Sequence, residues 1–223
     1  GRLAMALWKI FGVPSYDQFV GSADLYHFPN FFLPPLTSGR SVVSLHDLAF
    51  LRHPEFIESR NLRHLERTIP RTVQTCDALI TVSRFSANEI TSLLSIPPSK
   101  IFCTHLGVSP HFKPFSVEEK NSARIRLSLP PAYLLHVGTI EPRKNIPFAV
   151  EIFEQLSHYT GQLILAGGAG WKMEGILKRI NRSARRSRIH WLRNIPDTDL
   201  PALYACADAL LAPSYYEGFG LPP

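Results

Sequence analysis

The chain has 223 residues, an apolar fraction of 45% and a net charge of +6. This length fits one large or two modest domains, and the apolar content is sufficient for a packed core. No stretch approaches the roughly 18 uninterrupted apolar residues of a membrane-spanning helix. The three cysteines are scattered and lack metal-ligand spacing, so we expect buried, reduced thiols and a cytoplasmic protein: Cys76, Cys103 and Cys206.

Short apolar runs of strand-forming residues alternate with helical patterns along the chain. After an amphipathic helix at residues 3–8, the predicted strands of the first half are 25–28, 41–45, 78–82 and 101–105. Those of the second half are 133–137, 163–166, 189–192 and 209–212. Between the later strands, apolar residues recur with the spacing i, i+3, i+4, i+7. Such alternation predicts the α/β class, with parallel sheets covered by helices.

Two helix starts carry polar residues that are typical of caps. Ser86 and Glu89 match a capping box, and Asp197 or Thr198 can cap the last helix. We expect these side chains to bond backbone N–H groups at the helix starts, with no further role.

The alternation breaks between Val108 and Pro131, where four prolines surround a charged patch. Prolines in such a patch are typical of a connection between domains. We therefore expect a first α/β domain at residues 1–115, a linker with a short helix at 116–131, and a second α/β domain at 132–223.

The excess positive charge is local. Residues 178–188 contain six basic residues and no acidic one, and without them the remaining 18 basic residues equal the 18 acidic ones. A solvated helix face is one interpretation, and contact with an anionic membrane surface is the alternative. We expect no nucleic-acid partner.

Glycines and polar residues follow the predicted strands, at the edge where open parallel sheets bind ligands. Within residues 136–145, a strand ends at Gly138, and a turn then places Arg143 and Lys144 just before a helix. Such a pair can neutralise a diphosphate without a metal ion, since arginine makes forked contacts and lysine acts as a point charge. The alternative is a charged loop in which Glu141 pairs with Arg143.

Two other strand ends carry candidates. His46 follows the strand at 41–45, where an imidazole can bond a substrate hydroxyl or share a proton. Residues 214–220 carry Glu217 and two glycines ahead of prolines suited to a helix start, an arrangement that can hold an anion or a sugar hydroxyl. The turn at 167–170 lacks the full dinucleotide fingerprint, so we expect no nicotinamide cofactor.

Several of these segments together resemble glycosyltransferase family 4. They are residues 27–30, 43–48, 80–86, 136–145, 167–171, 197–204 and 213–222. The sequence GTIEPRKN at 138–145 looks most like bacterial mannosyltransferases of surface-polysaccharide assembly. The resemblance implies retaining enzymes of the GT-B architecture, with two Rossmann-like domains. It also implies that both domains are incomplete in this chain, which we then expect to be inactive alone.

The resemblance assigns a role to each matching residue. The catalytic residues of the family correspond to His46, near the reacting sugar, and Glu217, which faces the donor sugar. The donor-binding residues correspond to Gly138, Arg143, Lys144, Gly218, Phe219, Gly220 and Leu221. Arg143 and Lys144 match the diphosphate-binding pair, and no metal ion or cofactor is implied. Some members carry arginine at the position of Thr139, so one phosphate contact is absent here.

The expected function is transfer of a hexose, first of all mannose from GDP-mannose, to a glycan or lipid-linked acceptor. The expected place is the cytoplasm, or the inner face of the plasma membrane through peripheral contact. Two alternatives remain open from the sequence. One is a truncated or degenerate nucleotide-sugar-binding protein without turnover, and the other is a nucleotide-sugar epimerase of the same fold.

Overall fold

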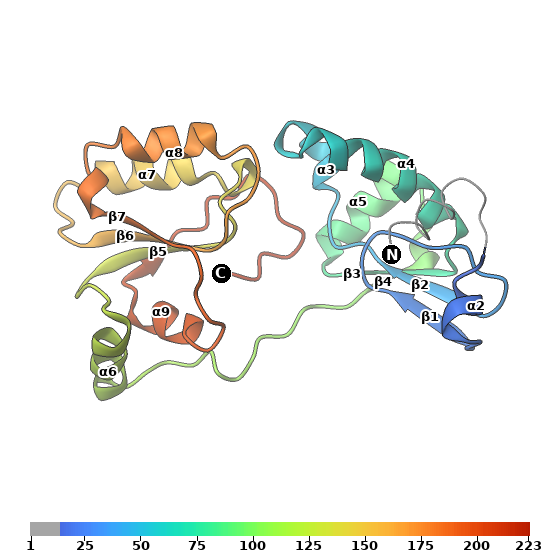
Figure 1. Ribbon diagram of the computed structural model, residues 1–223, viewed down its shortest axis with the longest axis horizontal. Coiled ribbons are helices and arrows are strands. Elements are labelled where there is room, and N and C mark those ends of the chain that lie inside the picture. The colour runs from blue at the N-terminus through green and yellow to red at the C-terminus, as the bar shows by residue number, and fades with distance from the viewer. Residues whose placement is uncertain (1–13) are drawn as a thin grey trace. The chain divides into compact units, whose positions relative to one another are not determined.

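The computed structural model describes residues 14–223, and the helix predicted at residues 3–8 lies outside them. The chain divides into two compact units after Leu106. Each unit is built on a four-stranded parallel sheet flanked by helices (Figure 1). The predicted α/β class with two Rossmann-like units is therefore confirmed, and each predicted strand is present.

The sheet of the first unit runs in chain order. Its strands are β1 (Leu25–Phe28), β2 (Arg40–Ser44), β3 (Ala78–Thr81) and β4 (Ile101–Cys103). The helices are α2 (Asp17–Val20), α3 (Ala49–Arg52), α4 (Ser59–Thr75) and α5 (Arg84–Leu94), with 3-10 turns at Pro54–Phe56 and Pro98–Lys100. Right-handed crossovers that step in one direction leave their helices on one face. In Figure 1, α4 and α5 accordingly lie on the same side of the sheet.

The start of α5 differs from the sequence prediction. Ser83 is the N-cap, and its Oγ accepts a hydrogen bond from the Ser86 N–H at 3.0 Å. Ser86 is buried, and Glu89 instead accepts two hydrogen bonds from Arg52 of α3, at 2.6 and 2.8 Å. The capping box predicted at Ser86 and Glu89 is wrong, because α5 begins at Arg84, which places Ser86 inside the helix, and the glutamate pairs with Arg52.

The sheet of the second unit has the order β7-β6-β5-β8. Its strands are β5 (Tyr133–Val137), β6 (Gln162–Ala166), β7 (Ile189–Leu192) and β8 (Ala209–Leu210). The helices are α6 (Val117–Leu127), α7 (Ile146–Gln155), α8 (Glu174–Asn181) and α9 (Leu200–Cys206), with 3-10 turns at Pro142–Lys144 and Arg186–Arg188. Because β8 pairs with β5 on the side opposite β6, the winding reverses at β5. As Figure 1 shows, α7 and α8 cover one face of this sheet, and α9 and α6 the other.

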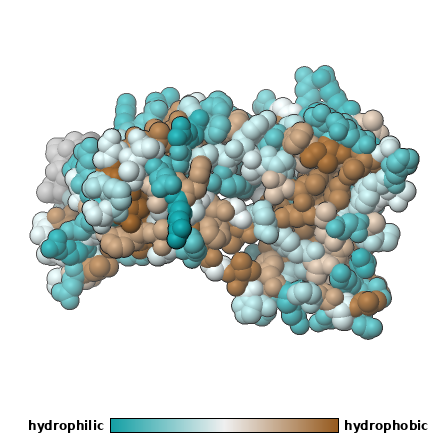
Figure 2. All heavy atoms as spheres, turned by 180° about the vertical axis from the view of Figure 1, so that it is seen from behind, coloured by the Kyte–Doolittle hydropathy of each residue, from teal (hydrophilic) through white to brown (hydrophobic). Residues whose placement is uncertain are grey.

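Alternate residues of these strands contribute to two separate cores. The first core joins the sheet to α7 and α8 through Leu134, Leu163, Leu165, Val150, Phe153 and Ile180. The second joins it to α6 and α9 through Tyr133, Leu135, Ile164, Ala123, Leu203 and Cys206. Burial of both faces explains why these strands are continuous apolar runs. Hydrophobic residues also gather on the surface of this unit in the view of Figure 2.

The segment predicted as a linker, residues 116–131, contains α6. Ala123 of this helix is buried in the second core, and α6 packs against α9. Ser116 Oγ accepts from the Glu119 N–H at 3.1 Å, and the Glu119 carboxylate accepts from the Ser116 N–H at 2.6 Å, a complete capping box. Since the buried face of α6 belongs to this core, the structure makes these residues part of the second unit. Its boundary after Leu106 lies before residue 115, the predicted end of the first domain.

Two smaller expectations also change. Cys76 and Cys206 are buried free thiols, but Cys103 is exposed, because β4 is an edge strand with few covering side chains. Neither Asp197 nor Thr198 caps α9: its N-cap is Asp199, which makes no side-chain capping bond. Among residues 14–223, none of the helices combines the length and the apolar character needed to cross a bilayer.

The basic cluster at 178–188 is largely bonded within the second unit. Arg185 donates hydrogen bonds to the carbonyl oxygens of Phe153 and Leu156, at 2.9 Å each, and to that of Ser157 at 3.3 Å. These carbonyls lie at the end of α7, where the last turn of a helix lacks intrahelical donors. Arg185 therefore acts as a C-terminal cap contributed from another part of the chain.

Two further arginines of the cluster are also engaged. Arg179 forms an ion pair with Glu154 at 2.5 Å. Arg188 donates to the carbonyl oxygens of Tyr159 at 2.8 Å and Gly161 at 2.9 Å, in the turn before β6. The interpretation of this cluster as a solvated face is wrong for these arginines, because their guanidinium groups are bonded within the fold.

We expect Arg185→Gln to destabilise the second unit by roughly 1–3 kcal/mol, because three carbonyl groups lose a charged donor. Arg182→Gln removes the same charge from an exposed position and should cost about 0.5 kcal/mol or less. Urea denaturation followed by circular dichroism compares the two variants. Equal losses would show that the Arg185 bonds do not stabilise α7.

Candidate donor site

The loops that follow β5 and β8 meet at the point where the winding of the second sheet reverses. Neighbouring connections there go to opposite faces, which opens a crevice outside the carboxyl ends of the strands. The first loop runs through residues 138–145 and the second through 211–220. They are joined by a hydrogen bond from the Tyr215 N–H to the Arg143 carbonyl oxygen, at 3.0 Å.

Arg143 and Lys144 both bond to Glu217 across this crevice. Arg143 Nη1 lies 2.8 Å from Glu217 Oε2, and Lys144 Nζ lies 2.6 Å from Glu217 Oε1. Arg143 also donates to Glu141 Oε1 at 2.8 Å and to the Tyr216 carbonyl oxygen at 3.0 Å. Each oxygen of the Glu217 carboxylate thus has its own cation. The Glu141–Arg143 ion pair of the charged-loop interpretation is present in the structure. Both cations also pair with Glu217, which the spacing in the sequence does not indicate.

These charges lie in a partly desolvated setting, with side-chain exposures of 18% for Arg143, 10% for Lys144 and 28% for Glu217. Burial raises the pKa of Glu217. Hydrogen bonds from Lys144 and Ser214, together with the charges of Lys144 and Arg143, outweigh this and hold the pKa below its usual value. Glu217 is therefore a carboxylate at neutral pH.

The local sequence explains how the cations reach this position. Pro142 begins a 3-10 turn that ends at Asn145, whose left-handed conformation (φ 51°) leads directly into α7. Gly138 has φ 151°, and a Cβ there would lie 3.2 Å from Lys144 Cε. A glycine at the strand end thus lets the Lys144 side chain lie against the backbone.

A cavity of about 610 Å³ opens at the carboxyl ends of β5, β6 and β7. Its walls include Gly138, Gly167 and the segment 193–197. The Arg193 guanidinium stacks 4.0 Å from the centre of the Trp191 ring, and Trp191 Nε1 donates to the Gly167 carbonyl oxygen at 2.8 Å. Arg193 lines this cavity, and Trp191 lines a separate hollow behind it. Backbone groups and a planar guanidinium suit a flat heterocycle with polar edges. The sequence analysis missed this stack, although a tryptophan in a strand followed closely by arginine is a signal that was available.

His136 is a second residue that the sequence analysis did not single out. It is 1% exposed on β5, and its Nδ1 lies 2.9 Å from the Leu211 carbonyl oxygen, so that Nδ1 donates. Burial lowers the pKa of His136 and outweighs the opposing effect of the Leu211 bond. Its Nε2 has no hydrogen-bond partner among the described residues. The neutral ring thus anchors the loop after β8 to the central strand.

The remaining candidates of the second unit follow Glu217 in an irregular segment. Gly218 is buried, Phe219 and Leu221 are 38% and 50% exposed, and Gly220 has φ 81°. Leu221 lines a separate, mainly apolar hollow together with Tyr204. Residues 218–221 thus lie next to Glu217, and their role as backbone donors to the ligand stays a prediction.

His46 lies in the first unit, at the carboxyl end of β2. Its ring is exposed, and Nε2 donates to the Pro29 carbonyl oxygen at 3.0 Å. The ring also meets Phe31 edge-on, with 5.9 Å between centroids. The strand-end position matches the sequence analysis, and these two contacts fix the ring orientation. Its catalytic role stays a prediction.

Solved structures share this architecture. WaaG, a glycosyltransferase involved in lipopolysaccharide biosynthesis, superposes with a TM-score of 0.73 at 19% identity, over 92% of this chain and 57% of that one. Anabaena HepE in complex with UDP-glucose gives a TM-score of 0.63 at 19% identity, over 79% of this chain and 47% of that one. The fold is that of the GT-B glycosyltransferases.

Sequence comparison matches the second half of the chain to a family. Residues 117–223 match the model of the family described as Glycosyl transferases group 1. It is 36% identical over 202 residues to O-antigen chain mannosyltransferase B of Escherichia coli, covering 89% of this chain and 53% of that protein. It is 30% identical over 197 residues to the serotype-specific mannosyltransferase WbdA of Escherichia coli, covering 82% and 24%. The chain thus spans about half the length of the first of these relatives.

The Glu217 ion pairs make stability depend on pH. Because the folded pKa of Glu217 lies below its ordinary value, the pairs stabilise the fold at neutral pH, and this stabilisation is lost as the pH falls through the folded pKa. We expect Glu217→Gln to cost roughly 1–3 kcal/mol at neutral pH and to lose less stability on acidification than the wild type. Urea denaturation at neutral and acidic pH measures both effects. Glu66→Gln, on the exposed surface of α4, is the control, and a wild-type pH dependence in Glu217→Gln would contradict the assignment.

Proposed function

We propose that this chain carries the donor site of a retaining glycosyltransferase, which moves a hexose from a nucleotide-diphosphate sugar to an acceptor. The observation that carries this proposal is the convergence of Arg143 and Lys144 on one carboxylate at the crevice. Two cations that reach both oxygens of a carboxylate can equally reach two oxygens of a diphosphate. The match of residues 117–223 to the group 1 glycosyltransferases and the adjoining cavity support the same function.

The donor diphosphate takes the place of the Glu217 carboxylate at these two cations. Arg143 keeps its second partner, the 3% exposed Glu141, and so stays oriented during the exchange. As the bond to the sugar breaks, negative charge builds up on the leaving diphosphate, where Arg143 and Lys144 stabilise it. Preorganised charges in a partly desolvated site usually make the largest single contribution to lowering the activation barrier.

The other parts of the donor have matching surroundings. The base and ribose occupy the cavity beside Gly138 and Gly167, where backbone groups and the Arg193 guanidinium supply polar and planar contacts. Glu217, released from the cations, accepts hydrogen bonds from sugar hydroxyl groups. Backbone N–H groups of residues 218–221 bind beside it. His46, at the end of its own strand in the first unit, is proposed to bond a sugar hydroxyl.

The proposed reaction retains configuration without a protein nucleophile. The bond from the anomeric carbon to the phosphate oxygen breaks, and a bond to the acceptor oxygen forms on the same face. The acceptor proton moves to the leaving phosphate. Because the two cations neutralise the diphosphate, the step needs no metal ion or other cofactor.

The names of the relatives support a proposal for the sugar and the acceptor. Both Escherichia coli proteins are mannosyltransferases by name, which supports mannose from GDP-mannose as the donor. The O-antigen named in one of them supports a glycan acceptor, either free or lipid-linked. We further propose that transfer takes place in the cytoplasm, with peripheral contact at the inner face of the plasma membrane.

A panel of nucleotide sugars tests this function directly. In a protein of the relatives' length that contains this chain, we expect release of GDP from GDP-mannose that depends on an added glycan acceptor and is undiminished in excess chelator. Activity restored only by manganese would contradict the metal-free site. Binding without turnover would indicate a degenerate sugar-nucleotide-binding protein, and product formed without acceptor would indicate an epimerase.

Substitution of one cation tests the site. In the same longer protein, we expect Lys144→Ala to lower turnover by about 30- to 1,000-fold, because a charge-assisted phosphate contact is worth on the order of 2–4 kcal/mol in the transition state. Lys178→Ala, which removes the same charge from an exposed position on α8, should leave turnover unchanged. Calorimetric titration with GDP separates the binding loss from the loss in turnover. Equal rates for the two variants would contradict the assignment of Lys144.

A further inference from the structure

Phe31 has a backbone conformation that bulky residues rarely adopt. Its φ is 47°, in the left-handed region. Other residues of the range 14–223 with positive φ lie directly at helix boundaries: Ser95, Ser128 and Asn145. Phe31 lies in the irregular segment between β1 and β2, away from the helices on either side. No helix boundary therefore accounts for its conformation, and a large side chain in this region strains the backbone.

Hydrogen bonds on both sides of Phe31 hold this segment in place. The Phe31 N–H donates to the Ser44 carbonyl oxygen of β2 at 3.2 Å. Two residues later, the Leu33 N–H donates to Thr72 Oγ1 of α4 at 3.4 Å. A strained residue persists where the surrounding structure determines its conformation in this way.

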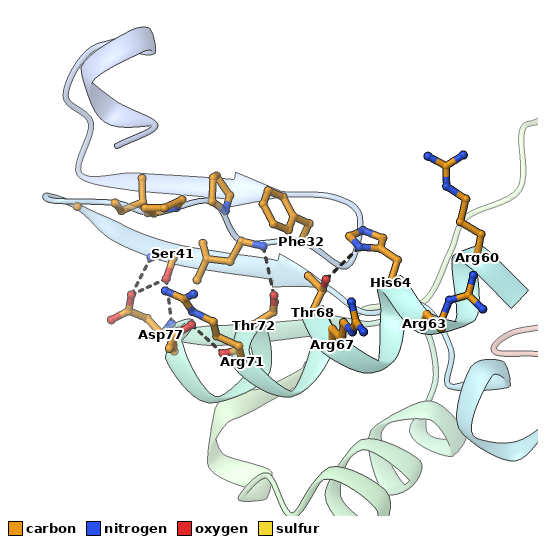
Figure 3. Close-up of a pocket in the computed structure, with 16 residues that line it drawn as sticks. Phe32, Ser41, Arg60, Arg63, His64, Arg67, Thr68, Arg71, Thr72 and Asp77 are labelled. Atoms are coloured by element: carbon orange, nitrogen blue, oxygen red, sulfur yellow. Dashed lines mark hydrogen bonds between the residues drawn. The ribbon is translucent and has the colours of Figure 1, made fainter. Parts of the chain in front are cut away.

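The residues that follow Phe31 have a different environment. Phe32 and the residues up to Leu36 form one wall of a groove of about 800 Å³ in the first unit (Figure 3). The other wall is α4, which contributes a row of arginines: Arg60, Arg63, Arg67 and Arg71. Phe31 does not line this groove, so the two adjacent aromatic rings lie in different surroundings.

The Phe31 ring contacts His46. The two rings meet edge-on, with 5.9 Å between their centroids and an angle of 85° between their planes. His46 Nε2 donates to the Pro29 carbonyl oxygen at 3.0 Å. The His46 carbonyl oxygen accepts a hydrogen bond from the Oγ of the buried Ser86 at 3.2 Å. Both the ring and the backbone of this exposed histidine are therefore held in position.

The bond to Pro29 also selects the tautomer of His46. A carbonyl oxygen can only accept a hydrogen bond, so the proton lies on Nε2 and the neutral ring has a lone pair on Nδ1. Among residues 14–223, no donor forms a hydrogen bond to this Nδ1. A hydroxyl group of a ligand can therefore donate to it.

We propose that Phe31 is a positioning residue, whose strained conformation holds the His46 ring so that Nδ1 accepts a hydrogen bond from a sugar hydroxyl. Strain of this kind occurs at binding and catalytic positions, where it preforms the geometry that the ligand needs. The inference rests on the function proposed above, in which His46 bonds a sugar hydroxyl. It adds the direction of that bond and the residue that prepares it.

Turnover of matched variants tests the role of Phe31 in the longer protein described above. Phe31→Leu should lower kcat by roughly 10-fold, the factor that corresponds to an ordinary hydrogen bond. Phe31→Tyr keeps the ring and should retain kcat, and Phe32→Leu, the same change in the next residue, should also retain it. Calorimetric titration with GDP should give the wild-type affinity in each variant. An unchanged kcat in Phe31→Leu would overturn the proposal.

Stability distinguishes a positioning residue from one that only packs in the fold. Asparagine tolerates the left-handed region, so Phe31→Asn should keep or raise the urea midpoint of unfolding while it lowers kcat. A midpoint that falls together with kcat would show a packing role for Phe31 and would overturn the proposed strain.

Variants of His46 test the direction of the bond and the coupling to Phe31. Asparagine places an oxygen near the position of Nδ1, whereas glutamine reaches that of Nε2, so His46→Asn should retain more turnover than His46→Gln. The opposite order would overturn the assignment of Nδ1. Phe31→Leu combined with His46→Ala should lower kcat no further than His46→Ala alone, and independent losses would overturn the coupling. Wild-type turnover in His46→Ala would overturn the role of His46, while Lys144→Ala decides the donor site separately.

Discussion

The arrangement of the second unit depends on the pairing of β8 with β5, on the side opposite β6. This pairing reverses the winding of the sheet and brings the end of the chain next to the loop after β5. β8 has only two residues, so other contacts must hold it in place. The Tyr133 hydroxyl donates to the Leu203 carbonyl oxygen of α9 at 2.7 Å, and His136 bonds Leu211 just after the strand. Both contacts originate on β5, which makes this strand the reference for the whole site.

Two cations and two carboxylates meet where the winding of the sheet reverses, so their formal charges cancel. Their neutrality allows the four groups to be partly desolvated without an uncompensated charge. The two carboxylates are not equivalent. Glu141 is buried and on the same loop as Arg143, whereas Glu217 is more exposed and comes from the loop after β8. The second partner can therefore be exchanged for another anion while the first keeps the guanidinium oriented.

Arginine has two different uses in this chain, and the difference lies in its surroundings. Where a helix ends near the cluster, as α7 does beside Arg185, the carbonyl oxygens of the last turn bind the guanidinium. Where the arginines lie along a helix, as on α4, most backbone acceptors are already used in the helix itself. The same side chain thus caps a helix in one unit and lines a groove in the other.

The sequence by itself determined the strands, the α/β class and the pair Arg143–Lys144, because apolar runs, helical periodicity and turn residues are local signals. The tertiary structure alone decided which groups each polar side chain meets. It paired Glu89 with Arg52, joined α6 to the second core, exposed Cys103 and placed Glu217 on both cations. The partners of these groups lie far away along the chain, and one pattern of residues is compatible with many such pairings. Only the packing of the sheet and its helices selects one of them.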